Sequence, residues 1–128
     1  MGSAERFATL KRRIDAATGL ALVKRFIAGD ALSATEQRTA VRFTLEEFAE
    51  RYPGHAVEIR VPWIGAVQAI SGVNHRRGAP PNIVEMDGQT WLAMVTGVAP
   101  TGTTPDTKTI SSSGTRADLT PYLPLVFS

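Results

Sequence analysis

The amino-acid sequence predicts an α+β fold, with helices packed on one face of a small, mainly antiparallel sheet. Apolar residues recur at steps of three and four through residues 7–52, which is the spacing of one face of a helix. From residue 57 onward, apolar and polar residues alternate in short runs, as they do in half-buried strands. Because the helices precede the strands instead of alternating with them, the order favours α+β over a chain of βαβ units.

Two helices are predicted at the N-terminal end. An apolar stripe over residues 7–17 predicts the first, which Gly19 is expected to interrupt. A second stripe over residues 20–27 predicts a short helix that Gly29 closes.

A third helix is predicted over residues 33–52. Ser33 and Glu36 have the Ser-x-x-Glu spacing of a capping box, in which each side chain accepts the other residue's free backbone N–H. The apolar residues that follow share one helical face and are Val41, Leu45, Phe48 and Tyr52. The Pro-Gly pair at residues 53–54 then ends the helix.

The second half of the chain predicts short strands and one short helix. Asp87 is placed to cap a helix over residues 90–95, and Gly97 ends it. Residues 117–125 predict a short helical or turn segment, limited by two prolines. The predicted strands are residues 57–61, 66–70, 82–86 and 108–113.

Composition excludes several classes of protein. The chain has 128 residues, 43% of them hydrophobic, which is the size and make-up of one soluble domain with a core of its own. It has no cysteine, so disulfides, thiolate zinc sites and a cysteine nucleophile are excluded. A net charge of +2 without a basic stripe does not suggest nucleic acid as a partner. No apolar stretch is long enough for integral membrane contact, and no apolar signal core is present, so we expect a cytoplasmic protein.

Candidate catalytic chemistry centres on the second of two histidines. His75 precedes Glu85 and Asp87 by about ten residues, and a histidine beside a carboxylate can act as a general acid or base, so a small hydrolase or isomerase is one hypothesis. No nucleophile elbow or phosphate-binding loop accompanies it. The same residues also fit a basic loop that anchors the sheet or orients an anionic head group. His55 follows a turn and is expected to be a solvated loop residue. No metal-ligand spacing is present, so neither a metal nor a cofactor is expected.

Three blocks of sequence resemble the bacterial sterol carrier family domain, a relative of the sterol carrier protein type-two fold. The first is Val-Glu-Ile-Arg-Val-Pro at residues 57–62, followed by Gly-Ala-Val-Gln at residues 65–68. The longest is His-Arg-Arg-Gly-Ala-Pro-Pro-Asn-Ile-Val-Glu-Met-Asp at residues 75–87, followed by Thr-Trp-Leu at residues 90–92. The third is Ser-Gly-Thr-Arg-Ala-Asp-Leu at residues 113–119. The resemblance covers roughly residues 33–127.

The resemblance implies a mixed, largely antiparallel sheet of about five strands, with helices on one face. It also implies an apolar tunnel between sheet and helices that binds a lipid, an acyl chain or a similar apolar molecule without catalysing a reaction. The basic residues 75–77 would then hold a carboxylate or phosphate head at the mouth. The expected ligand-binding residues, as lining, lid or mouth, are Trp63, Ile64, His75, Arg76, Arg77, Trp91, Met94, Leu123, Leu125 and Phe127.

The chain departs from the family pattern in places that bear on function. Ala69 stands where the family has cysteine, and Gly88 where it has proline. Residues 98–107 are rich in Pro, Gly and Thr, where the family has a helix that helps to wall the cavity. A structural or protein-interaction module that keeps the fold without a working tunnel is therefore the alternative.

The domain boundaries expected from these observations are simple. We expect one domain over residues 1–128, with residues 1–32 as a helical extension and residues 33–128 as the core. The apolar run at residues 123–127 would be uncovered on the alternative hypothesis, and a second copy or a protein partner would cover it.

Overall fold

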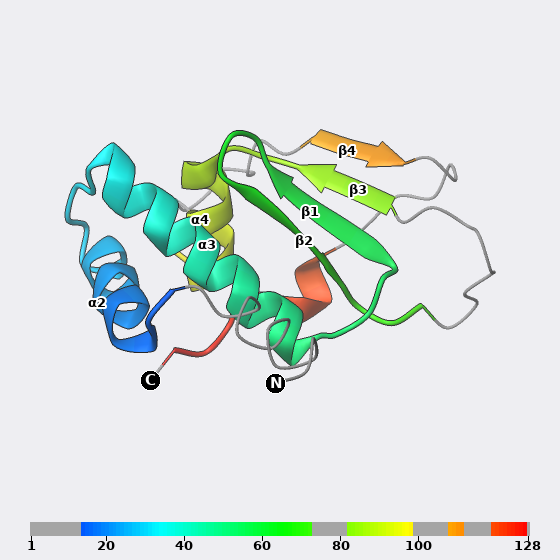
Figure 1. The fold of residues 1–128 in the computed structure, drawn as a ribbon, viewed down its shortest axis with the longest axis horizontal. Helices are drawn as coiled ribbons and strands as arrows, with labels where there is room; N and C mark the ends of the chain where they lie inside the picture. The colour runs from blue at the N-terminus through cyan, green and yellow to red at the C-terminus, as the bar shows by residue number, and fades with distance from the viewer. Residues whose placement is uncertain (1–13, 73–81, 99–107, 112–118, 128) are drawn as a thin grey trace, which may run out of the picture.

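A layer of helices lies against a twisted sheet (Figure 1). The structure is a computed structural model that describes residues 14–72, 82–98, 108–111 and 119–127. It confirms the α+β class. In chain order the elements are α2 (Ala16–Ile27), α3 (Ala34–Arg51), β1 (Val57–Val61), β2 (Gly65–Ala69), β3 (Asn82–Glu85), α4 (Gly88–Thr96), β4 (Lys108–Ser111) and the 3-10 helix η1 (Thr120–Tyr122).

The strands form one mixed sheet in the order β2-β1-β3-β4. The β1–β2 and β3–β4 pairs are antiparallel, whereas β1 and β3 run parallel. All four predicted strands are present with shifts of one or two residues at their ends, although residues 112–113 of the last lie outside the described residues. Four strands are described, so the expected total of about five is not confirmed.

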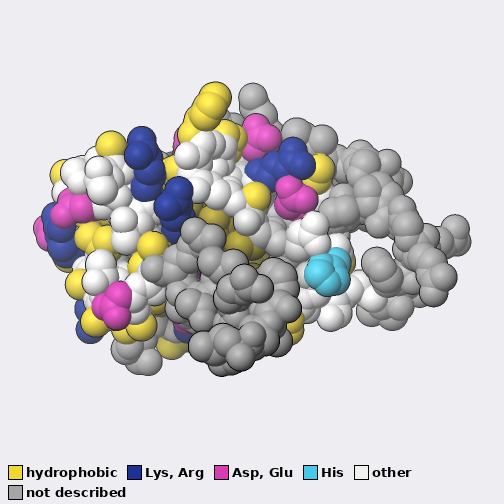
Figure 2. All heavy atoms as spheres, viewed as in Figure 1, with side chains coloured by type: hydrophobic (Ala, Val, Ile, Leu, Met, Phe, Trp, Pro, Cys, Tyr) yellow, Lys and Arg dark blue, Asp and Glu magenta, His cyan; other side chains and the backbone are white. Residues whose placement is uncertain are grey.

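The helices differ in whether they contact the sheet directly. Helix α3 packs against β2 and α4, whereas α2 packs mainly on α3. The expectation that the N-terminal helices all pack on the sheet is therefore too simple, because α2 packs on the helices α3 and α4. In the view of Figure 2, charged side chains of both signs are scattered over the helices and the sheet, as expected for a net charge of +2.

Helix α3 is the central element and begins as predicted. The Ser33 hydroxyl accepts from the Glu36 N–H at 3.1 Å, and the Glu36 carboxylate accepts from the Ser33 N–H at 2.9 Å, so the capping box is confirmed. Its buried residues occupy more than the predicted apolar face, because α2 covers a second side. They are Ala40, Val41, Phe43, Thr44, Leu45 and Phe48.

Gly19 does not interrupt a helix, contrary to the prediction. Helix α2 runs through it without a break, and the Asp15 carboxylate caps the helix by accepting from the Thr18 N–H at 3.1 Å. A Cβ atom at residue 19 would overlap the ring of Phe43. The glycine therefore allows α2 and α3 to approach closely. The predicted helix over residues 7–17 lies mostly outside the described residues.

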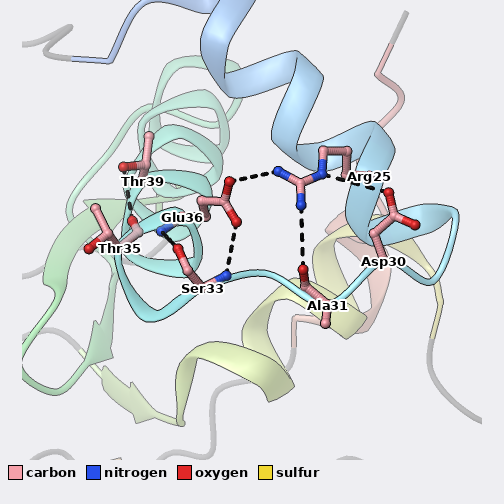
Figure 3. Close-up of polar contacts among 7 residues, drawn as sticks. All are labelled: Arg25, Asp30, Ala31, Ser33, Thr35, Glu36 and Thr39. Atoms are coloured by element: carbon pink, nitrogen blue, oxygen red, sulfur yellow. Dashed lines mark hydrogen bonds and ion pairs between the residues drawn. The ribbon is translucent and has the colours of Figure 1, made fainter.

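An ion-pair network ties α2 to the start of α3 (Figure 3). The Arg25 Nη1 atom lies 2.7 Å from Glu36 Oε2, and its Nη2 donates to the Ala31 carbonyl at 3.4 Å. Asp30 lies 3.6 Å from Arg25 Nε. Hydrogen bonds from the Ser33 backbone and from Arg25 hold the pKa of Glu36 below its ordinary value. Glu36 therefore belongs to the capping box of α3 and also holds α2 through Arg25.

The predicted helix after β3 is confirmed as α4. The Asp87 carboxylate accepts from the Thr90 N–H at 2.7 Å, and Gly97 ends the helix in the left-handed conformation at φ 79°. The C-terminal segment then returns to this end, where the Leu125 N–H donates to the Val95 carbonyl at 2.9 Å. Part of the predicted helical or turn segment at residues 117–125 forms η1.

Candidate ligand-binding region

Trp91 stands at the centre of the interior between helices and sheet. Its side chain is fully buried, and its indole N–H donates to the Thr44 hydroxyl at 2.8 Å. The hydroxyl in turn donates to α3 backbone carbonyls, at 2.8 Å from that of Ala40 and 3.0 Å from that of Val41. Every polar group of this buried pair is satisfied, so Trp91 joins α4 to α3 at fixed geometry.

Four aromatic rings extend from this centre toward the surface, and we call them the aromatic cluster. The Phe48 ring meets the Trp91 ring edge-on at 5.8 Å between centroids. Tyr52 lies 5.2 Å from Phe48, and Tyr122 lies 5.0 Å from Tyr52. Because both tyrosines are partly exposed, the aromatic cluster runs from the core to solvent, and its outer rings belong to the C-cap of α3 and to η1.

The predicted apolar residues of the C-terminal run pack against the chain's own core. Leu125 is buried, and Leu123 and Phe127 are partly buried against the core. The Phe127 ring lies 6.4 Å from that of Phe43, and the Arg51 guanidinium carbon lies 5.6 Å from the same ring. The expectation of an uncovered apolar run is therefore wrong, except at Pro124, which is exposed, and at Val126, which is 76% exposed.

The remaining predicted site residues do not come together. Ile64 and Met94 are partly buried against the core, and Trp91 belongs to it. Trp63 is 97% exposed and lies in the turn between β1 and β2, so its side chain does not line the interior. The predicted mouth residues His75, Arg76 and Arg77 lie outside the described residues.

The carboxylates suggested as partners of His75 have other surroundings. Asp87 caps α4, as described above, and Glu85 lies next to Arg60 in the parallel register of β3 and β1. The exposed His55 ring pairs with the Gln68 amide through Nδ1 at 2.7 Å.

Among the described residues, no group of three or more His, Asp or Glu side chains is arranged to hold a metal ion. No helix in the described part of the chain is long and apolar enough to cross a membrane.

A family model described as "Bacterial SCP ortholog" matches residues 33–125. The chain belongs to this family. The match begins at Ser33, the N-cap of α3, and ends at Leu125, the residue that bonds to the end of α4. It therefore includes the sheet, the aromatic cluster and the C-terminal return, while α2 precedes it. No curated protein matches the chain.

The candidate site residues predicted from the sequence include neither Tyr52 nor Tyr122, and Thr44 was not predicted as the polar partner of Trp91. Thr44 falls between the apolar positions of α3, so its burial depends on neighbours that periodicity does not show. Tyr122 lies between two prolines, in a segment without a repeating pattern. The one available signal was Tyr52 on the apolar face of the predicted helix, because a tyrosine at the end of such a stripe often lies at the edge of a core.

Proposed function

We propose that this protein binds a lipid or another apolar small molecule, reversibly and without catalysing a reaction, between its sheet and its helices. The single observation that carries the proposal is the aromatic cluster, a path of packed rings from the buried Trp91 to the partly exposed Tyr52 and Tyr122. Membership of the bacterial SCP ortholog family is consistent with such carriage.

The chemistry of this path suits an acyl chain or a ring system better than a charged substrate. Tyrosine rings offer apolar faces while their hydroxyls remain available to water. Met94 and Leu123 also pack against the core from its edge, and methionine adapts to ligands of different shape. We place the entrance between the side chains of Tyr52, the C-cap of α3, and Tyr122 of η1, because neither residue belongs to a strand.

The test is native mass spectrometry of gently purified protein, followed by titration with a fluorescent fatty acid. A mass excess that matches a lipid, or saturable uptake of the probe, supports the proposal. A clean apo mass together with no uptake contradicts it. Such a result with a dimer in light scattering favours the alternative, a structural or interaction module without a tunnel.

Variants locate the binding path. Tyr122→Ala is expected to weaken uptake of the probe by about tenfold, because a large apolar contact is removed. Tyr122→Phe keeps the ring and is expected to bind within about twofold of the parent. Val126→Ala shortens an exposed apolar side chain of the same segment and serves as the matched control. Equal uptake by all three variants would place the ligand elsewhere.

A further inference from the structure

The turn between β1 and β2 presents a tryptophan to solvent in an unusual backbone conformation. Trp63 is 97% exposed, and its φ is 70°, in the left-handed region that residues other than glycine rarely adopt. Its neighbour Pro62 is exposed as well. A large exposed apolar side chain held in a disfavoured conformation is what a binding residue shows when the fold positions it in advance.

The rest of the fold holds this turn in place. The Ile64 N–H donates to the Val61 carbonyl at 3.0 Å and closes the turn. The Arg42 Nε atom, on α3, donates to the Ile64 carbonyl at 3.1 Å. Ile64 itself packs against the core, so the tip that carries Trp63 is anchored on both the helix and the sheet.

Positive charge lies beside this tip. Arg42 is exposed next to it, and Arg38, one helical turn earlier on α3, is exposed too. Arg60 is bonded to Glu58 and adds little net charge. In Figure 2 an apolar side chain projects beyond the surface at the end of the β1–β2 hairpin, and basic side chains lie over α3 beside it. The tip therefore combines a convex apolar projection with basic neighbours.

We propose that this tip docks the protein on a membrane surface that contains anionic phospholipids, with Trp63 as the anchor and Arg38 and Arg42 as the charged flank. A convex projection needs a partner that yields around it, and the fluid interface of a bilayer does so. Indole rings favour that interface, and guanidinium groups are attracted to anionic head groups. The contact is peripheral and goes beyond the proposed function, because Trp63 lies outside the aromatic cluster.

The test uses the full chain with vesicles of phosphatidylcholine alone or of phosphatidylcholine with phosphatidylserine. Trp63 is 97% exposed and Trp91 is buried. The part of the fluorescence change that Trp63→Phe loses is assigned to Trp63, because Trp91 remains in that variant and reports any lipid taken into the core. With anionic vesicles we expect a blue shift of emission, protection from acrylamide, and quenching by brominated acyl chains near the interface. Added salt should weaken the binding, since the attraction is screened. No binding of the parent protein to anionic vesicles overturns the proposal, whether or not the protein takes up a fatty acid.

Variants separate the anchor from the charged flank. Trp63→Ala is expected to lower vesicle partition about tenfold or more, and Trp63→Phe by less, because the buried apolar area differs. Arg38→Gln with Arg42→Gln should reduce binding to anionic vesicles and its dependence on salt. Val126→Ala and Lys24→Gln change one exposed apolar and one exposed basic residue on other elements, and should bind as the parent does. Undiminished binding by Trp63→Ala, with a melting curve like the parent's, would also overturn the proposal.

Discussion

The ring of Phe43 lies in the space that a side chain at residue 19 would fill. Gly19 is on α2 and Phe43 is on α3, and both are buried where the two helices cross. The two helices can therefore lie this close only because residue 19 has no side chain. This relationship predicts an unusual response to a substitution that ordinarily strengthens a helix.

Gly19→Ala should destabilise the protein. In an open helix the change stabilises by about 1 kcal/mol, but forcing a methyl group into a packed crossing costs about 1–3 kcal/mol. We expect a lower urea midpoint for Gly19→Ala. The double variant with Phe43→Leu should recover part of the loss, because the smaller side chain makes room. A stabilised Gly19→Ala would contradict the close approach of α2 and α3.

The same substitution should have different effects at the two tryptophans. Trp91→Phe removes a buried hydrogen bond to Thr44 and leaves a void, so we expect a loss of about 2–4 kcal/mol in free energy of unfolding. Trp63→Phe changes an exposed side chain and should shift stability by less than about 0.5 kcal/mol. Chemical denaturation of both variants tests this.

Thr44→Val gives a second measure of the Trp91 contact. It leaves the indole N–H without an acceptor, and we expect a cost of about 1–3 kcal/mol in free energy of unfolding. Because the two side chains are bonded to each other, their substitutions should not be additive. Combined with Trp91→Phe, the penalty should be smaller than the sum of the two. Strict additivity would mean that the two side chains do not interact.

Stability should depend on pH through Glu36. Its pKa is lowered in the folded protein, first by the Ser33 N–H and then by Arg25. Stability from this group is therefore fully present above the unfolded pKa of about 4.3 and is lost as pH falls through the lower folded value. Glu36→Gln keeps an acceptor at the cap but removes the charge. The difference in urea midpoint between parent and variant should be largest near neutral pH and vanish in acid; a difference that is constant down to pH 2 would exclude the ionic contribution.

Local patterns predicted the elements that local physics determines. The capping box of α3, the alternation of β1 and the aspartate and glycine that bound α4 each act within a few residues, and the structure confirms all three. The helix break predicted at Gly19 is wrong because the glycine makes room for Phe43, which lies on another helix, 24 residues away in the sequence. The expectation of about five strands rests on the family resemblance, whereas the described residues contain four strands.

The candidate site was harder to predict because its residues meet through tertiary contacts. Trp63 and Trp91 looked equally suited to line a cavity, yet one lies in a hairpin turn and the other in the core. The two-residue difference between a strand end and a turn decides exposure, and periodicity locates such ends poorly. Tyr122 packs in the aromatic cluster because the C-terminal segment folds back on α4, and no repeating sequence pattern predicts that fold-back.

The return of the C-terminal segment to α4 has a consequence for synthesis of the protein. Leu119 and Leu125 fill the core, and Tyr122 closes the ring stack on Phe48 and Tyr52. Until these residues leave the ribosome, the nascent chain holds helices and strands whose apolar surfaces are open. Such a chain is a substrate for chaperones and prone to aggregate. Emergence of residues 119–127 from the ribosome, and not completion of the sheet, is then the event that ends this exposure.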